Sequence, residues 1–140
     1  MKSIRYQHIK HAKEWLKYAT NDELNARSIL THKDGAPNGP CFISQQMSEK
    51  YLKGLLVFYG KNVPKIHDLL ALETLLLAIE PTIKELHKDF ALLNRYYIIA
   101  RYPADYPEFS WKDAQEAYEA ALRIKDFVLE KIKTLPLTAP

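Results

Sequence analysis

The chain has little of several features that whole classes of protein require. It contains one cysteine, Cys41, and only four glycines among 140 residues. A single cysteine excludes an internal disulfide and fits a reducing cytosol, so we expect a cytoplasmic protein. The scarcity of glycine argues against a β-sandwich with many tight turns. No apolar run reaches the length of a membrane span, and the N-terminal stretch lacks the apolar region of a signal peptide.

The chain also lacks a large excess of charge of either sign. Lys and Arg number 20 against 17 Asp and Glu, which gives a net charge of +3. This mildly basic balance permits a nucleic-acid surface without requiring one. A length of 140 residues with 47% apolar content is enough for one core without disulfides or metals. We therefore expect a single domain over residues 1–140, with a tail that frays from about residue 134.

Apolar residues recur with a helical period along most of the chain. They share one face in the stretch Trp15–Leu30, and a second run covers Cys41–Tyr59. Gly60 suits the position after a helix end. The leucine-rich stretch 69–79 predicts a short buried helix, because β-branched residues are scarce in it. Pro81 suits the first turn of the helix that follows.

The last two helices carry inner stripes. In the helix after Pro81 we place Leu93 and Tyr97 on the inner face. Ser110 can cap the final helix, with Asp113 three residues later as in a capping box. Alanines on the inner face of that helix let it lie close to a neighbour. The sequence thus predicts an all-α fold, an antiparallel up-and-down bundle of four long helices plus one short helix.

Polar residues form a second pattern in the run SQQMSEKYLKGLL. Gln45, Glu49 and Lys53 recur every four residues and share a helix face, and Lys50 lies next to that face. One interpretation is a solvated stripe with a Glu49–Lys53 ion pair, which contributes about 0.3–0.5 kcal/mol. The other is a face turned toward a ligand, where lysines supply charge for phosphate. The sequence leaves both open.

Histidines raise the question of catalysis or metal binding. His67 and Asp68 begin the short helix, where Asp68 can cap the helix and His67 can fix the loop by a hydrogen bond. A catalytic base at His67 is the less favoured alternative. His8 and His11 have a spacing that can bind metal on a helix, but an accidental spacing is the favoured interpretation. We therefore predict no metal site and no cofactor.

The stretch IIARYPADYPEF carries the densest group of polar and aromatic residues. Arg101 lies four residues after Tyr97, so we expect it to point inward or toward the end of the bundle. An inward arginine needs a partner or a ligand. Pro103 stops the helix and leaves Asp105 in a turn just beyond. Arg101 and Asp105 either form an ion pair or frame an anionic ligand.

Together these residues resemble the HEPN family, the "higher eukaryotes and prokaryotes nucleotide-binding" domain. The resemblance rests on CFISQQMSEKYLKGLL, VPKIHDL and RYPADY in this order, and covers roughly Trp15 to Lys131. It implies a helical bundle that commonly forms a homodimer, with a cleft near the arginine where nucleotide or RNA is handled. It also implies a minimal nucleotidyltransferase as protein partner, often as toxin and antitoxin.

Family members that act as metal-independent ribonucleases carry an arginine, four to six residues, and then a histidine. Here Arg101 is followed after four residues by Tyr106, and no histidine follows His87. A tyrosine, with an ordinary pKa of about 10, is a poor base at neutral pH. Tyr106 also resembles the tyrosine that the partner transferase of some family toxins modifies with AMP.

Three hypotheses follow. The favoured one is a dimeric nucleotide- or RNA-binding module without catalysis, with nine Tyr, five Phe and two Trp as a further reason to expect a dimer. Its ligand-binding residues would be Arg101, Tyr102, Asp105, Lys50, Lys53, Glu49 and His67. The second is a ribonuclease toxin that uses Arg101 with Tyr106 or His67. The third is a structural dimerisation bundle in which Arg101 and Asp105 form an internal ion pair.

Overall fold

The computed structural model describes residues 4–100 and 108–133, and within these ranges it contains helices and no strand. The elements are α1 (Ile4–His32), α2 (Asn38–Phe58), α3 (Leu69–Leu77), the 3-10 helix η1 (Pro81–Leu86), α4 (His87–Ala100) and α5 (Trp111–Lys133). The prediction of an all-α fold is confirmed. Three of the described helices are long, with 29, 21 and 23 residues, whereas α4 has 14.

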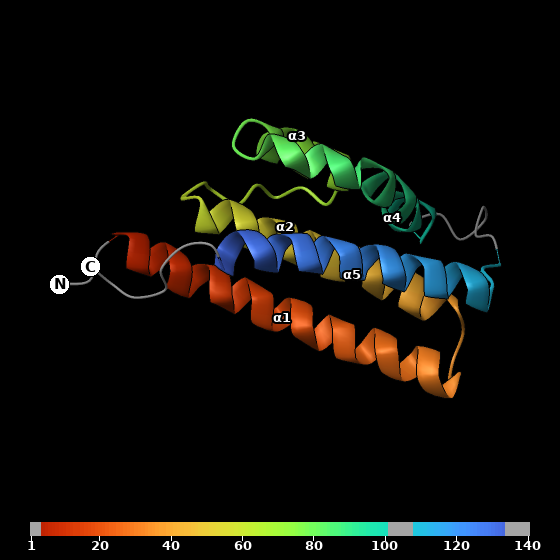
Figure 1. Cartoon of the computed structure of the whole chain (residues 1–140). Helices are drawn as coiled ribbons and strands as arrows, with labels where there is room; N and C mark the ends of the chain where they lie inside the picture. The colour runs from red at the N-terminus through yellow and green to blue at the C-terminus, as the bar shows by residue number, and fades with distance from the viewer. Residues whose placement is uncertain (1–3, 101–107, 134–140) are drawn as a thin grey trace.

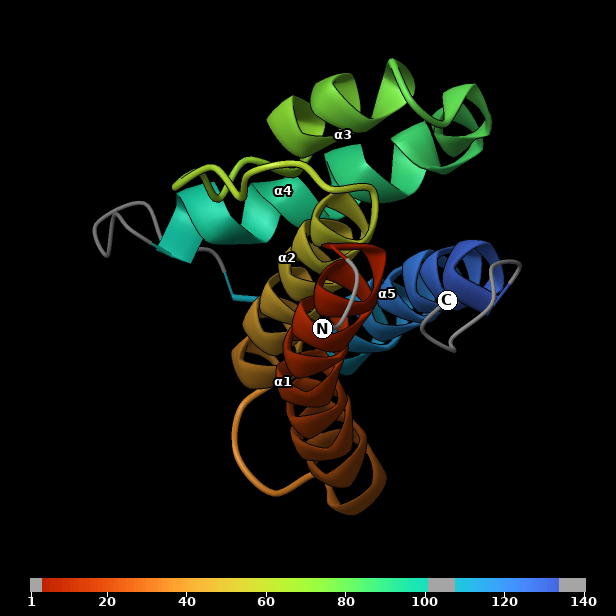
Figure 2. The ribbon, with the colours of Figure 1, turned by 90° about the vertical axis from the view of Figure 1, so that its left-hand side faces the viewer.

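The helices form two layers. α1, α2 and α5 lie side by side, with α1 running opposite to α2 and α5, while α3 and α4 cover one side of this group (Figures 1 and 2). α2 lies at the centre and contacts α1, α3, α4 and α5. The segment between α2 and α3 turns back along α2 (Figure 1). This return places residues 60–68 next to the polar face of α2.

The burial of α2 side chains agrees with the central position of this helix. Residues 51–58 of α2 are all buried, so this half of the helix has no solvent face. Gly54 allows close packing on α1, because a Cβ atom at this position would lie 3.2 Å from Cβ of Trp15. The predicted inner stripe of α5 is confirmed, since all its members are buried: Ala114, Ala117, Ala121, Ile124, Val128 and Ile132. A helix with small residues on its inner face can approach α2 closely.

Local sequence sets the helix ends as predicted. After α2, Gly60 has a φ of 78°, and the amides of Gly60 and Lys61 donate to the carbonyls of Val57 and Leu56, as in a Schellman motif. At α5, Ser110 Oγ accepts from the amide of Asp113 at 3.0 Å, and the Asp113 carboxylate accepts from the amide of Ser110 at 2.9 Å. These hydrogen bonds lower the pKa of Asp113. The capping box is thus present.

Two local predictions were wrong in detail. Pro81 begins η1 rather than an α-helix, and α4 starts six residues later. Tyr96, not Tyr97, completes the inner stripe of α4, with 4% of its surface exposed, whereas Tyr97 is half-buried. Both tyrosines follow Leu93 at a helical spacing, so periodicity alone cannot separate them. The consequence concerns the functional site, because Tyr97 turns toward His67 instead of the core.

None of the described helices is long and apolar enough to cross a membrane. The predicted frayed tail, residues 134–140, lies outside the described residues.

Cys41 is packed in the core, and none of its surface is exposed. Burial raises the pKa of its thiol to about 12, so the thiol stays protonated at neutral pH. We expect Cys41 to react with an aromatic disulfide reagent only when the protein unfolds, as followed by absorbance in buffer and in denaturant. Rapid stoichiometric reaction in buffer would contradict this packing.

Candidate functional site

A hollow of about 190 Å³ lies where α2 meets the start of α3 and the end of α4. Its lining residues are Gln45, Gln46, Glu49, Lys50, His67 and Tyr97. α2 supplies four of them at i, i+1, i+4 and i+5, which is one helix face. We call this hollow the His67 site.

Glu49 is the centre of the site. Its carboxylate accepts a hydrogen bond from Lys53 Nζ at 3.0 Å and lies 3.1 Å from His67 Nδ1. Lys53 is 5% exposed, while the His67 side chain is 53% exposed. The three groups therefore form a row from a buried ammonium, through a carboxylate, to an imidazole at the surface. With Nδ1 donating to Glu49, the acceptor nitrogen of a neutral ring is Nε2.

His67 is held from several sides. The fully buried Gln45 donates from Nε2 to the backbone carbonyl of His67 at 3.1 Å. The imidazole packs against Tyr97, with ring centroids 5.3 Å apart. These contacts fix both the backbone and the ring, so the site is preorganised. Within the described residues, Oε1 of Gln45 is buried without a hydrogen-bond partner, and such an acceptor is a place where water or a ligand group can bind.

The residue after His67 is fixed as well. Asp68 caps α3, as predicted, because its Oδ1 accepts from the amide of Leu70 at 2.9 Å. Asn94 of α4 donates to the same oxygen at 3.1 Å and accepts from the amide of Leu69 at 2.9 Å. Hydrogen bonds thus connect the His67–Asp68 segment to both α4 and α2.

The polar stripe predicted on α2 takes a mixed form. The Glu49–Lys53 pair is present, but the stripe is not solvated, because Gln45 and Lys53 are buried. Lys50 lines the hollow, and its ammonium forms an ion pair with Asp22 of α1. Both lysines therefore have carboxylate partners.

The structure brings four of the predicted site residues together: Glu49, Lys50, Lys53 and His67. The other predicted residues lie outside the described residues: Arg101, Tyr102, Asp105 and Tyr106. Sequence reasoning missed Tyr97, which it placed in the core, and Asp22, whose contact with Lys50 joins α1 to α2. No local signal marks such a pairing, because the two residues are 28 positions apart.

Metal binding has no support in the part of the chain that is described. No group of three or more His, Cys, Asp or Glu side chains there could hold an ion. His8 and His11 lie together at another hollow, between α1 and the end of α2.

Two solved structures have folds similar to that of this chain. The protein TT1696 from Thermus thermophilus is 32% identical, with a TM-score of 0.72, over 86% of this chain and 97% of that chain. ST0689, described as an archaeal HEPN homologue, is 31% identical, with a TM-score of 0.70 and the same two coverages. No curated protein matches the chain.

A family model of the HEPN domain matches residues 12–132. The matched range includes every described residue of the His67 site and all helices except the first residues of α1 and the last residue of α5. The chain belongs to the HEPN domain family.

Proposed function

We propose that this HEPN domain binds the phosphate of a nucleotide or RNA at the His67 site. The observation that carries the proposal is the row Lys53–Glu49–His67, which ends in an exposed, oriented imidazole beside Tyr97. A partly exposed histidine held by a carboxylate suits a donor to a phosphate oxygen or a proton acceptor. The half-buried Tyr97 beside it supplies apolar surface for a ligand.

Arg101 would supply the charge. It follows Ala100, the last residue of α4, and comes four residues after Tyr97. Because Lys50 and Lys53 already pair with carboxylates, their net contribution to anion binding is reduced, and the bidentate guanidinium becomes the main phosphate ligand. In this proposal Asp105 orients Arg101.

Tyr102 would stack on a base, as aromatic side chains do in many RNA-binding sites. In this proposal the domain binds its ligand without catalysis, because Tyr106 stands where the ribonucleases of the family carry a histidine.

The assembly is also part of the proposal. We propose a cytoplasmic homodimer that works with a minimal nucleotidyltransferase. Family membership supports this, and so do large apolar side chains that the described surface leaves exposed, among them Ile4, Tyr18 and Leu24. Light scattering at micromolar concentration should give twice the chain mass, and a single sharp monomer would contradict the dimer.

The second candidate is a metal-independent ribonuclease, and the contact between His67 and Glu49 favours it. An imidazole whose Nδ1 is held by a carboxylate can take the proton of a ribose 2′-hydroxyl at Nε2. The resulting alkoxide would attack the adjacent phosphorus, with Arg101 neutralising the charge on the phosphate oxygens and the 5′-oxygen leaving. Tyr106, which stands at the family's histidine position, could protonate that leaving group.

One assay separates these functions. Purified protein is incubated with single-stranded RNA in EDTA, and bound and cleaved RNA are measured together, with Arg101→Ala and His67→Gln as variants. The binding module predicts binding without cleavage and loss of binding in Arg101→Ala. Cleavage that disappears in both variants would establish the ribonuclease. Absence of both binding and cleavage would leave the structural bundle as the correct account.

A further inference from the structure

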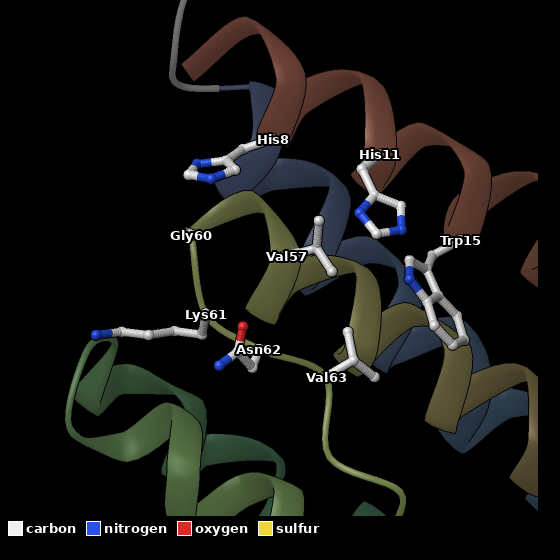
Figure 3. Close-up of a pocket in the computed structure, with 8 residues that line it drawn as sticks. All are labelled: His8, His11, Trp15, Val57, Gly60, Lys61, Asn62 and Val63. Atoms are coloured by element: carbon white, nitrogen blue, oxygen red, sulfur yellow. The ribbon is translucent and has the colours of Figure 1, made fainter. Parts of the chain in front are cut away.

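A second hollow, of about 330 Å³, opens between the start of α1 and the turn after α2. Figure 3 shows His8, His11 and Trp15 extending from α1 toward α2 and the following turn, which carries Asn62. The remaining lining residues are Val57, Gly60, Lys61 and Val63. The volume is at the lower end of the range for small-molecule sites.

The turn after α2 accommodates the ring of His8. Gly60 has a φ of 78°, and a Cβ atom there would lie 2.9 Å from Cε1 of His8. A residue with a side chain would therefore strain the backbone, and its Cβ would displace the imidazole. Glycine lets the ring of His8 lie over the turn, at the edge of the hollow (Figure 3).

The lining has the chemistry of a site for anions. It combines two imidazoles, the exposed Lys61 and the amide of Asn62, and the eight lining residues include no carboxylate. Lys61 lies at the rim and its long side chain extends toward α3 (Figure 3). Imidazole, ammonium and amide N–H groups all donate to phosphate oxygens.

Trp15 adds an aromatic surface. It lines this hollow and also an adjoining one of about 300 Å³, together with His11, Glu14 and Tyr18. Gly54 lies beneath its Cβ, and Lys53 Nζ lies 6.0 Å from the ring centroid. The indole is thus supported from the core side and reachable from two hollows. Nucleobases stack on aromatic side chains placed in this way.

The same loop connects this hollow to the His67 site. Val63 lines the one and His67 the other, and four residues of extended chain span at most about 14 Å. Lys61, Lys65 and His67 are all exposed along this loop. Lys53 lies between the two ends, since it contacts Glu49 at one and Trp15 at the other.

From this arrangement we infer that the ligand is a single-stranded RNA several nucleotides long, bound along the loop 61–67. One phosphate lies at the His67 site, a base stacks on Trp15, and a second phosphate lies beside His8 and His11, with Lys61 at the rim. This inference rests on the proposed function and narrows its ligand, because a mononucleotide would fill the His67 site alone.

Tryptophan fluorescence tests the inference. The chain has two tryptophans, so a Trp111→Phe variant reports on Trp15 alone and a Trp15→Phe variant on Trp111. The probes are adenosine monophosphate and a 2′-O-methyl RNA octamer, which cannot be cleaved through a 2′-hydroxyl. The octamer should quench Trp15 and leave Trp111 unchanged, and the mononucleotide should quench neither.

Binding affinities provide the second readout. His11→Gln combined with Lys61→Gln should weaken octamer binding about tenfold and leave mononucleotide binding unchanged. A matched double variant, His32→Gln with Lys112→Gln, removes an exposed histidine from α1 and an exposed lysine from α5. It should bind both ligands like the wild type.

Failure of this inference and failure of the proposed function give different results. If the octamer binds and Arg101→Ala weakens it, yet Trp15 emission and the His11/Lys61 variant show no effect, the inference is overturned and the proposed function stands. If neither the mononucleotide nor the octamer binds, both are overturned.

Discussion

Replacing Arg101 with alanine should weaken binding of adenosine monophosphate and of short RNA by roughly tenfold to a hundredfold. A hydrogen bond to a charged group contributes about 1.5–3 kcal/mol, and each 1.4 kcal/mol is a factor of about ten in affinity. The loss should be this large because Lys50 and Lys53 already pair with Asp22 and Glu49 and cannot replace the guanidinium without breaking those pairs. Isothermal titration at fixed salt measures both ligands.

Arg95 provides the matched control. It is an exposed arginine on α4, six residues before Arg101 in the sequence. Arg95→Ala removes the same charge, so any general electrostatic effect should appear in both variants. Equal losses in the two variants would mean that net charge, rather than a site, binds the ligand. A normal affinity in Arg101→Ala would remove the arginine from the site.

Replacing Glu49 with alanine should lower the free energy of unfolding by about 3 kcal/mol, because loss of one partner leaves a buried charge without compensation. Lys53 is 5% exposed, and Glu49 is the carboxylate within 3.0 Å of its ammonium. The same change frees the imidazole of His67, so ligand affinity should fall as well. Urea unfolding followed by circular dichroism measures the stability.

Two further variants isolate the cause. Glu49→Ala combined with Lys53→Met removes both charges and should recover most of the lost stability, since an apolar pair replaces a broken ion pair. Glu116→Ala breaks the exposed pair with Lys112, which has the same four-residue spacing and a separation of 4.0 Å. It should change stability by less than about 0.5 kcal/mol. A double variant no more stable than Glu49→Ala would contradict the buried-charge explanation.

Local features of this fold were predictable because they depend on neighbouring residues. Gly60 ends α2, Asp68 caps α3, and Ser110 with Asp113 caps α5, as their residue types and spacing indicate. The buried face of α5 was equally predictable, because its alanines and other apolar residues recur at a helical spacing. Each of these depends on interactions within a few residues.

Features that depend on distant contacts were not predictable. Lys53 looks like a surface lysine in the sequence, but it is buried, with Glu49 as its ion-pair partner and the ring of Trp15 from α1 beside it. Tyr96 and Tyr97 compete for one inner position, and packing against Phe109 and His67 decides between them. The ring of His8 over Gly60 joins the start of α1 to the turn after α2. Sequence identified most of the site's residue types, whereas the structure shows which ones touch.

The most direct test of the site is the histidine NMR spectrum during a titration with adenosine monophosphate. His87 is an internal control, because its Nδ1 also contacts a glutamate, Glu73, at 2.8 Å, and its side chain is 61% exposed. His67 has the equivalent contact with Glu49 and 53% exposure. The ring signals of His67 should shift saturably while those of His87 stay in place. Saturable binding that leaves His67 unshifted, or shifts both histidines equally, would contradict a phosphate site at the end of α4.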